Sequence, residues 1–236
     1  MVVSSLIRRT SELGREARAV VRQGSLMAFP KRTASPVGAE RAVVFVHGFM
    51  AGGPVFDPMR AHVESVAGVE TVGLSYGPLE TFEHIAGRIA ALTKLSAHGR
   101  PVTIVGHSLG GLLARWYLQE LGGAIDQGGA VDRLITIASP HAGTDMARLA
   151  PGSLGAALRP GSVILQRLQA GRDRAKGVAH VAVVAGRDRM ILPPDSAGAI
   201  ADAEIHRFDD LGHNEALFDP RVVNLVAQRV RGSGVR

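Results

Sequence analysis

A serine between glycines is the strongest candidate for chemistry in this sequence. Ser108 stands in Gly106-His107-Ser108-Leu109-Gly110, directly after the apolar run Val102–Val105 and directly before the helical pattern Leu112–Leu121. This context predicts a sharp strand-to-helix turn, in which glycines allow a strained serine backbone and a close approach of the helix. The hydroxyl would project at a helix N-terminus, where developing negative charge is favoured. We therefore interpret Ser108 as a nucleophile rather than as part of an incidental glycine-rich turn.

A serine hydroxyl becomes a good nucleophile only when a base removes its proton. Among nine histidines, His213 is best placed, because it lies in a loop between the last predicted strand and the last predicted helix. In a parallel sheet that loop meets the edge that carries Ser108. Asp188 directly follows the apolar run Val178–Val184, so it is expected at the same edge, where it can hold the tautomer of the base. The order serine, aspartate, histidine is typical of this type of nucleophilic turn.

When a serine nucleophile attacks a carbonyl group, it forms a tetrahedral intermediate whose oxyanion needs backbone N–H donors. The N–H of Leu109, next to the nucleophile, is one candidate. The second is the N–H of Phe49, in the loop after the first predicted strand, where Gly48 permits a close backbone approach. His47 can be interpreted as a ligand or a base, but we favour a role in holding this loop through hydrogen bonds. His47, Gly48 and His107 are also expected to border the substrate.

These residues need a scaffold in which strands and helices alternate. Six short apolar runs are predicted to be strands: Ala42–Val46, Val69–Leu74, Val102–Val105, Leu134–Ala138, Val178–Val184 and Ala203–Phe208. Helices are predicted near residues 55–67, 82–98, 110–121, 193–201 and 215–230. Several of the strands are apolar on both faces, which indicates a mostly parallel sheet of about six strands flanked by helices.

Two segments fall outside this alternation. Residues 1–40 contain an amphipathic helix over 1–29 and then a linker rich in Pro, Ser, Thr and Gly. The helix either packs on the body of the domain or lies on a membrane surface. Residues 142–177 are predicted to be a short helical cap inserted into the domain that spans residues 41–236. In this cap, Leu165 and Leu168 are expected to contact the substrate, or alternatively to pack the cap on the body.

Composition limits the remaining possibilities. The 236 residues are 46% hydrophobic and include no cysteine, which excludes a fully disordered chain, a thiolate metal site and a cysteine nucleophile. The net charge of +6 is concentrated in residues 1–40 and 159–176, which carry +4 each. Because aromatic residues do not interleave these basic positions, we expect no nucleic-acid partner. The sequence shows no membrane-spanning run and no export signal, so a cytoplasmic location is expected. Peripheral membrane contact through residues 1–29 or the basic cap is left open.

With these residues in place, the chain resembles an α/β-hydrolase of the bacterial esterase and lipase group over about residues 41–230. The resemblance rests on His47-Gly48-Phe49, the turn from Gly106 to Gly111, the segment from Ala138 to Thr144, Asp188, and Gly212-His213. It implies that Ser108, Asp188 and His213 are nucleophile, acid and base. It also implies that Phe49 and Leu109 form the oxyanion hole and that no metal or organic cofactor is needed. Some lipases of this group hold a structural calcium, but no acidic cluster here identifies such a site.

We expect a serine carboxylic-ester hydrolase that acts on lipid-like acyl esters through an acyl-enzyme. An acyltransferase or a thioesterase would use the same three residues, and the sequence does not separate these activities. A non-catalytic lipid-binding protein is a weaker alternative, because nucleophile, base and acid are all present. The oligomeric state is left open.

Overall fold

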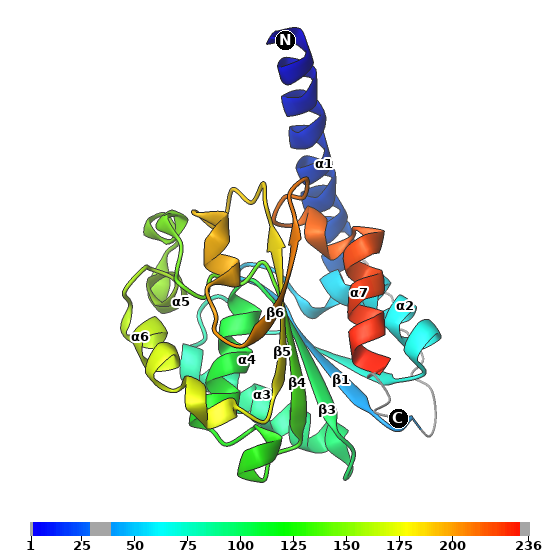
Figure 1. Cartoon of the computed structure of the whole chain (residues 1–236), viewed down its shortest axis with the longest axis vertical. Helices are drawn as coiled ribbons and strands as arrows, with labels where there is room; N and C mark the ends of the chain where they lie inside the picture. Colours follow the sequence, from blue (N-terminus) through cyan, green and yellow to red (C-terminus); the bar gives the residue numbers. More distant parts are fainter. Residues whose placement is uncertain (1, 29–38, 232–236) are drawn as a thin grey trace.

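The computed structural model describes the backbone of residues 2–28 and 39–231, and the side chains of residues 14–28 and 39–231. At its centre lies a sheet of six strands in the order β2-β1-β3-β4-β5-β6 (Figure 1). The strands are β1 Ala42–Val46, β2 Glu70–Leu74, β3 Val102–His107, β4 Val131–Ile137, β5 Ala179–Ala185 and β6 Ala203–Phe208. All the pairings are parallel, so every strand ends at the same edge of the sheet. The predicted fold class, a mostly parallel sheet of about six strands, is confirmed.

Helices and short turns connect these strands. The α-helices are α1 Val2–Ala28, α2 Asp57–Ala67, α3 Phe82–Ala97, α4 Leu109–Glu120, α5 Gly152–Ala157, α6 Val163–Ala170 and α7 Pro220–Arg231. The 3-10 turns are η1 Gly53–Phe56, η2 Ile125–Gln127, η3 Asp145–Arg148, η4 Arg172–Ala175, η5 Pro194–Gly198 and η6 Glu215–Leu217. The helix predicted at 193–201 is wrong, because only the 3-10 turn η5 forms there; it ends at Gly198, a residue that disfavours continuation of a helix.

The helices form one layer on each face of the sheet. Along β1, Ala42, Val44 and Val46 pack toward α3 and α4, while Val43 and Phe45 pack toward α2 and α7. All five side chains are buried, which explains why this strand is apolar at every position. The elements η3, α5, α6 and η4 lie between β4 and β5, within the segment predicted to be a cap. Of these, α5 and α6 join the layer of α3 and α4.

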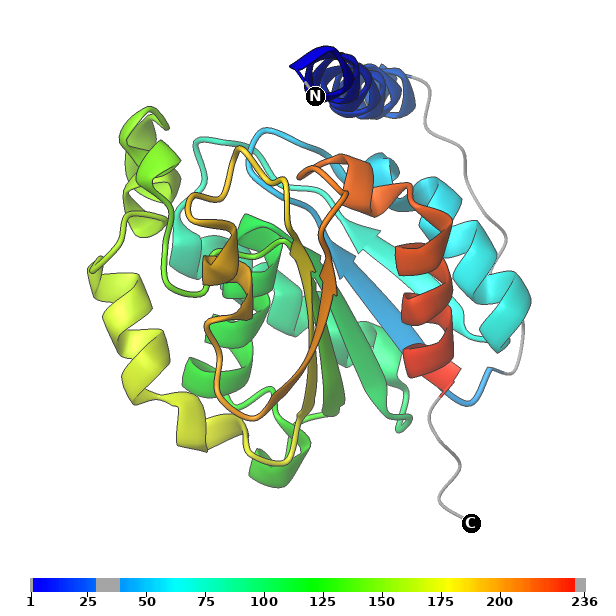
Figure 2. The ribbon, with the colours of Figure 1, turned by 45° about the horizontal axis from the view of Figure 1, so that its top comes forward.

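The N-terminal helix α1 stands apart from both layers. It lies across the edge at which the strands end (Figure 2), where it packs against η1 and η6. The predicted linker that follows it falls almost wholly outside the described residues. None of the helices in the described part of the chain combines the length and the apolar character that crossing a membrane would require.

Candidate active site

The turn between β3 and α4 presents Ser108 at the ends of the strands. Its backbone has φ 53° and ψ −123°, a strained conformation for a residue with a side chain. The N–H of Ser108 donates to the carbonyl of Ile137 at 2.9 Å, which ties the turn to β4. Glycines allow α4 to approach this closely, since a Cβ on Gly110 would lie 2.1 Å from the carbonyl oxygen of Val46. The local sequence therefore folds as the strand-to-helix turn that was predicted.

Asp188 and His213 form a buried pair at the same edge of the sheet. The Nδ1–H of His213 donates to Oδ2 of Asp188 at 2.7 Å. The other carboxylate oxygen, Oδ1, accepts the backbone N–H groups of Met190 at 2.8 Å and Ile191 at 2.7 Å. Every part of the carboxylate is thus engaged, so its orientation is fixed. The arrangement holds His213 with its proton on Nδ1 and leaves Nε2 free to accept a proton.

Charges around His213 favour its protonated form. Burial opposes the imidazolium, but the charge and hydrogen bond of Asp188, together with the charge of Glu16, raise the pKa of His213 above its usual value. The neighbouring His107 behaves in the opposite way, because burial and the proximity of His213 hold its pKa well below the usual range. Neutral His107 donates from Nε2 to the carbonyl oxygen of His213 at 3.2 Å. This bond links the backbone of the candidate base to the end of β3.

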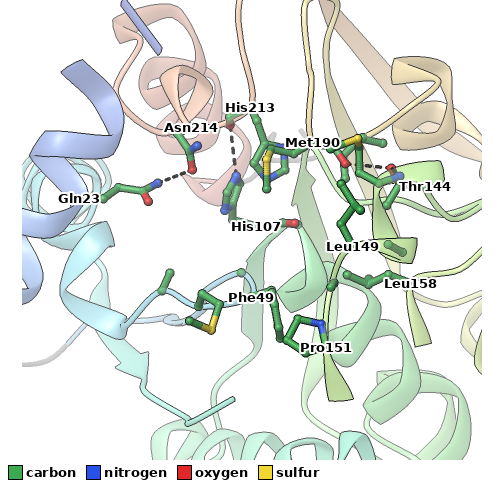
Figure 3. Close-up of a pocket in the computed structure, with 18 residues that line it drawn as sticks. Gln23, Phe49, His107, Thr144, Leu149, Pro151, Leu158, Met190, His213 and Asn214 are labelled. Carbon is green, nitrogen blue, oxygen red and sulfur yellow. Dashed lines mark hydrogen bonds between the residues drawn. The ribbon is translucent and has the colours of Figure 1, made fainter. Parts of the chain in front are cut away.

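Ser108 and His213 line one cavity with a volume of about 310 Å³. Most of its wall is apolar (Figure 3): it includes Phe49, Met146, Leu149, Pro151, Leu158 and Met190. His107 and Gly48, which are predicted to border the substrate, also line this cavity. A cavity of this size and lining suits an apolar group attached to a reactive polar centre.

The loop after β1 lies directly against the serine. A Cβ on Gly48 would come within 3.0 Å of the Cβ of Ser108, so only glycine leaves this space clear. Within the described part of the chain, the backbone N–H groups of Phe49 and Leu109 have no hydrogen-bond acceptor. Two unpaired donors close to the serine are suited to binding an oxyanion.

Three residues expected to contact the substrate lie elsewhere. His47 is fully buried and its ring stacks on that of Tyr76. Nε2 of His47 accepts the backbone N–H of Tyr76 at 3.1 Å. Its own Nδ1–H donates to the carbonyl of Gly48 at 2.8 Å, so the ring holds the loop, and burial lowers the pKa of His47 to about 4. Leu165 and Leu168 are buried in the core beside α4 and do not line the cavity, so the alternative, that they pack the cap on the body, is the one the structure supports.

Several residues that help to build the site have no role predicted from the sequence motifs. Thr144 donates its hydroxyl to the carbonyl of Met190 at 2.8 Å and accepts the N–H of Leu192 at 2.9 Å. It therefore ties the segment after β4 to the loop that carries Asp188. Gln23, from α1, lines the cavity and donates to the side-chain oxygen of Asn214 at 2.7 Å. Thr144 lies in a segment that the resemblance singled out, but no local pattern marks Gln23.

The described residues contain no group of three His, Cys, Asp or Glu side chains that could hold a metal ion.

Comparison with known proteins places this chain in a family. Residues 42–170, more than half of the chain, match the family described as palmitoyl protein thioesterase. The chain belongs to this family. The predicted α/β-hydrolase relationship is thereby confirmed, and the palmitoyl protein thioesterase match covers the turn with Ser108 and the loop with Phe49. No curated protein sequence matches the chain.

Solved structures share the fold of this family member at low sequence identity. The Bacillus licheniformis lipase BlEst2 has a TM-score of 0.63 and 15% identity, over 86% of this chain and 96% of that one. The Paleococcus ferrophilus monoacylglycerol lipase has a TM-score of 0.62 and 16% identity, over 84% and 94%. The type II thioesterase BorB from the borrelidin biosynthetic cluster has a TM-score of 0.59 and 16% identity, over 85% and 95%.

Proposed function

We propose that the chain is a serine ester hydrolase in which Ser108 is the nucleophile, His213 the base and Asp188 the acid. The observation that carries this proposal is the buried 2.7 Å contact between His213 and Asp188 beside the cavity that Ser108 lines. Membership of the palmitoyl protein thioesterase family supports ester hydrolysis as the reaction class.

The geometry supports a two-step acyl transfer. Oγ of Ser108 attacks the ester carbonyl while Nε2 of His213 takes its proton, and the oxyanion binds the N–H groups of Phe49 and Leu109. His213 then gives its proton to the leaving oxygen or sulfur, and the acyl group stays on Ser108. Water attacks this acyl-enzyme with the help of the same base, which releases the acid and restores the serine hydroxyl.

The cavity indicates an acyl substrate. Because its wall is mainly apolar, it favours an alkyl chain over a compact polar group. The matched family also favours a second candidate, in which the substrate is a thioester. The same nucleophile and base serve both reactions, and the leaving atom is the only chemical difference.

We also propose that the protein contacts a membrane surface through α1. On α1, Val20 and Val21 are 51% and 72% exposed, and Arg18 is exposed beside them. Apolar and basic side chains together on one helix suit peripheral contact with an anionic lipid surface.

Fluorophosphonate labelling tests the proposal directly. We expect one adduct, on Ser108, which disappears in Ser108→Ala and in His213→Ala but not in the matched exposed variant Ser153→Ala. Folded wild-type protein that is not labelled, with or without detergent, would refute the serine hydrolase. Rates for a pair of substrates with one acyl chain, joined once through oxygen and once through sulfur, then distinguish esterase from thioesterase.

A further inference from the structure

The helix α1 contacts the loop of the candidate base, although it lies outside residues 42–170, which match the family. In Figure 2 this helix lies over the ends of the strands, beside the segment that runs into α7. Its contacts with this loop come from Arg15, Glu16 and Gln23. The helix α1 therefore reaches the loop that carries the candidate base.

Glu16 makes the densest set of these contacts. Its Oε1 accepts the backbone N–H of Asn214 at 2.9 Å and the side-chain N–H of Asn214 at 2.7 Å. Its Oε2 accepts the backbone N–H of Glu215 at 3.1 Å. A Cβ on Gly212 would lie 2.4 Å from this same oxygen, so the glycine before His213 leaves room for the carboxylate. The residue before His213 thus leaves space for the Glu16 carboxylate, and the two residues after His213 donate hydrogen bonds to it.

Two further contacts keep α1 in register with the loop. Arg15 pairs with Glu215, with 2.6 Å between Nε and Oε1, and donates to the carbonyl of Asp210 at 2.9 Å. Gln23, further toward the C-terminal end of α1, donates to the side chain of Asn214. With several anchors on one rigid helix, the Glu16 carboxylate has little freedom to leave its position.

The charged and titratable groups that face His213 come from three elements. They are Asp188 after β5, His107 at the end of β3, and Glu16 on α1. Asp188 holds the ring through Nδ1, and His107 holds the carbonyl of His213. Glu16 holds the backbone N–H groups of the next two residues. The three together determine where Nε2 of His213 points.

We propose that Glu16 is a positioning residue for His213, which fixes the following backbone so that the imidazole faces Ser108. This inference rests on the proposed function of the site. It predicts both a geometric effect, through the hydrogen bonds, and an electrostatic effect, since a negative charge near His213 favours the imidazolium.

The test compares Glu16→Gln with wild type and with Glu83→Gln, which makes the same chemical change at an exposed position on α3. We expect kcat/KM of Glu16→Gln to fall by between about tenfold and a hundredfold, because the base is no longer held in register. Removal of the charge lowers the pKa of His213, so the acid limb of the pH profile moves to lower pH. Glu83→Gln should change neither, and Glu16→Asp, which keeps the charge, should restore the position of the acid limb.

Two outcomes would overturn the inference: an unchanged kcat/KM and profile in Glu16→Gln, or a uniform loss of activity with no movement of the acid limb. NMR titration of the His213 imidazole provides a readout that does not depend on turnover. If wild type neither hydrolyses esters nor is labelled on Ser108, the proposed function fails. The titration then still decides whether Glu16 acts on His213, because an unshifted titration in Glu16→Gln would refute the electrostatic effect.

Discussion

Replacing Asp188 by asparagine and by alanine should separate the two roles of this carboxylate. Oδ1 accepts two backbone N–H groups, so the side-chain oxygen of an asparagine must take that position. Its NH2 group then faces Nδ1 of His213, which is forced to become an acceptor and to carry its proton on Nε2. In this tautomer the base cannot take the proton of Ser108.

The two variants should therefore rank differently in activity and in stability. Asp188→Asn keeps the bonds to Met190 and Ile191, while its tautomer effect lowers kcat by about 10⁴, or about 5 kcal/mol in the barrier. Asp188→Ala leaves the N–H of Ile191 buried and unpaired, which lowers the free energy of unfolding by about 1–3 kcal/mol, while water can replace part of the bond to the exposed Met190. Its histidine can still adopt either tautomer.

Urea denaturation and steady-state hydrolysis of one chromogenic ester measure the two quantities. We expect Asp188→Ala to be the less stable variant and Asp188→Asn to be no more active than Asp188→Ala. An asparagine variant that clearly exceeds the alanine variant in kcat would refute the tautomer argument. Equal stability of the two variants would refute the role given to the backbone bonds.

Three further predictions concern charge, strain and membrane contact. Because the pKa of His213 is raised and only the neutral ring accepts a proton, kcat/KM should fall as the pH drops through a value above 6.5, and a limb below 6.5 in a pH profile would contradict this. Ser108→Gly should abolish labelling yet raise the free energy of unfolding by about 1 kcal/mol, since glycine relieves the strain at φ 53°; a loss of stability in urea denaturation would argue against that strain. Val21→Asp should weaken binding to anionic vesicles in a sedimentation assay, and equal binding would exclude contact through this face of α1.

Local patterns predict most of the fold and the loops of the site, but not the contacts between distant segments. The apolar run at β1 and the glycines around Ser108 carry their own signals, because strand burial and a tight turn depend on neighbouring residues. Glu16 and Asn214 are 198 residues apart, and a glutamate on an amphipathic helix looks the same whether it faces water or a loop. For a related reason the sequence leaves open whether Leu165 contacts the substrate or packs the cap, since apolar spacing indicates that one side of a helix is buried without indicating what covers it.

The place of β6 at the border of the sheet affects how the enzyme would lose activity on heating. β6 pairs only with β5, and Glu204, Ile205 and Arg207 on it are exposed, whereas β3 has a neighbour on each side. Edge strands of this kind open in partial unfolding reactions that leave the core intact, and their backbone amides exchange with solvent sooner than those of central strands. We therefore expect the strand that leads to His213 to separate from the nucleophile before the core of the sheet unfolds. Because α1 holds the loop that follows β6 through Arg15 and Glu16, we expect it to oppose this opening.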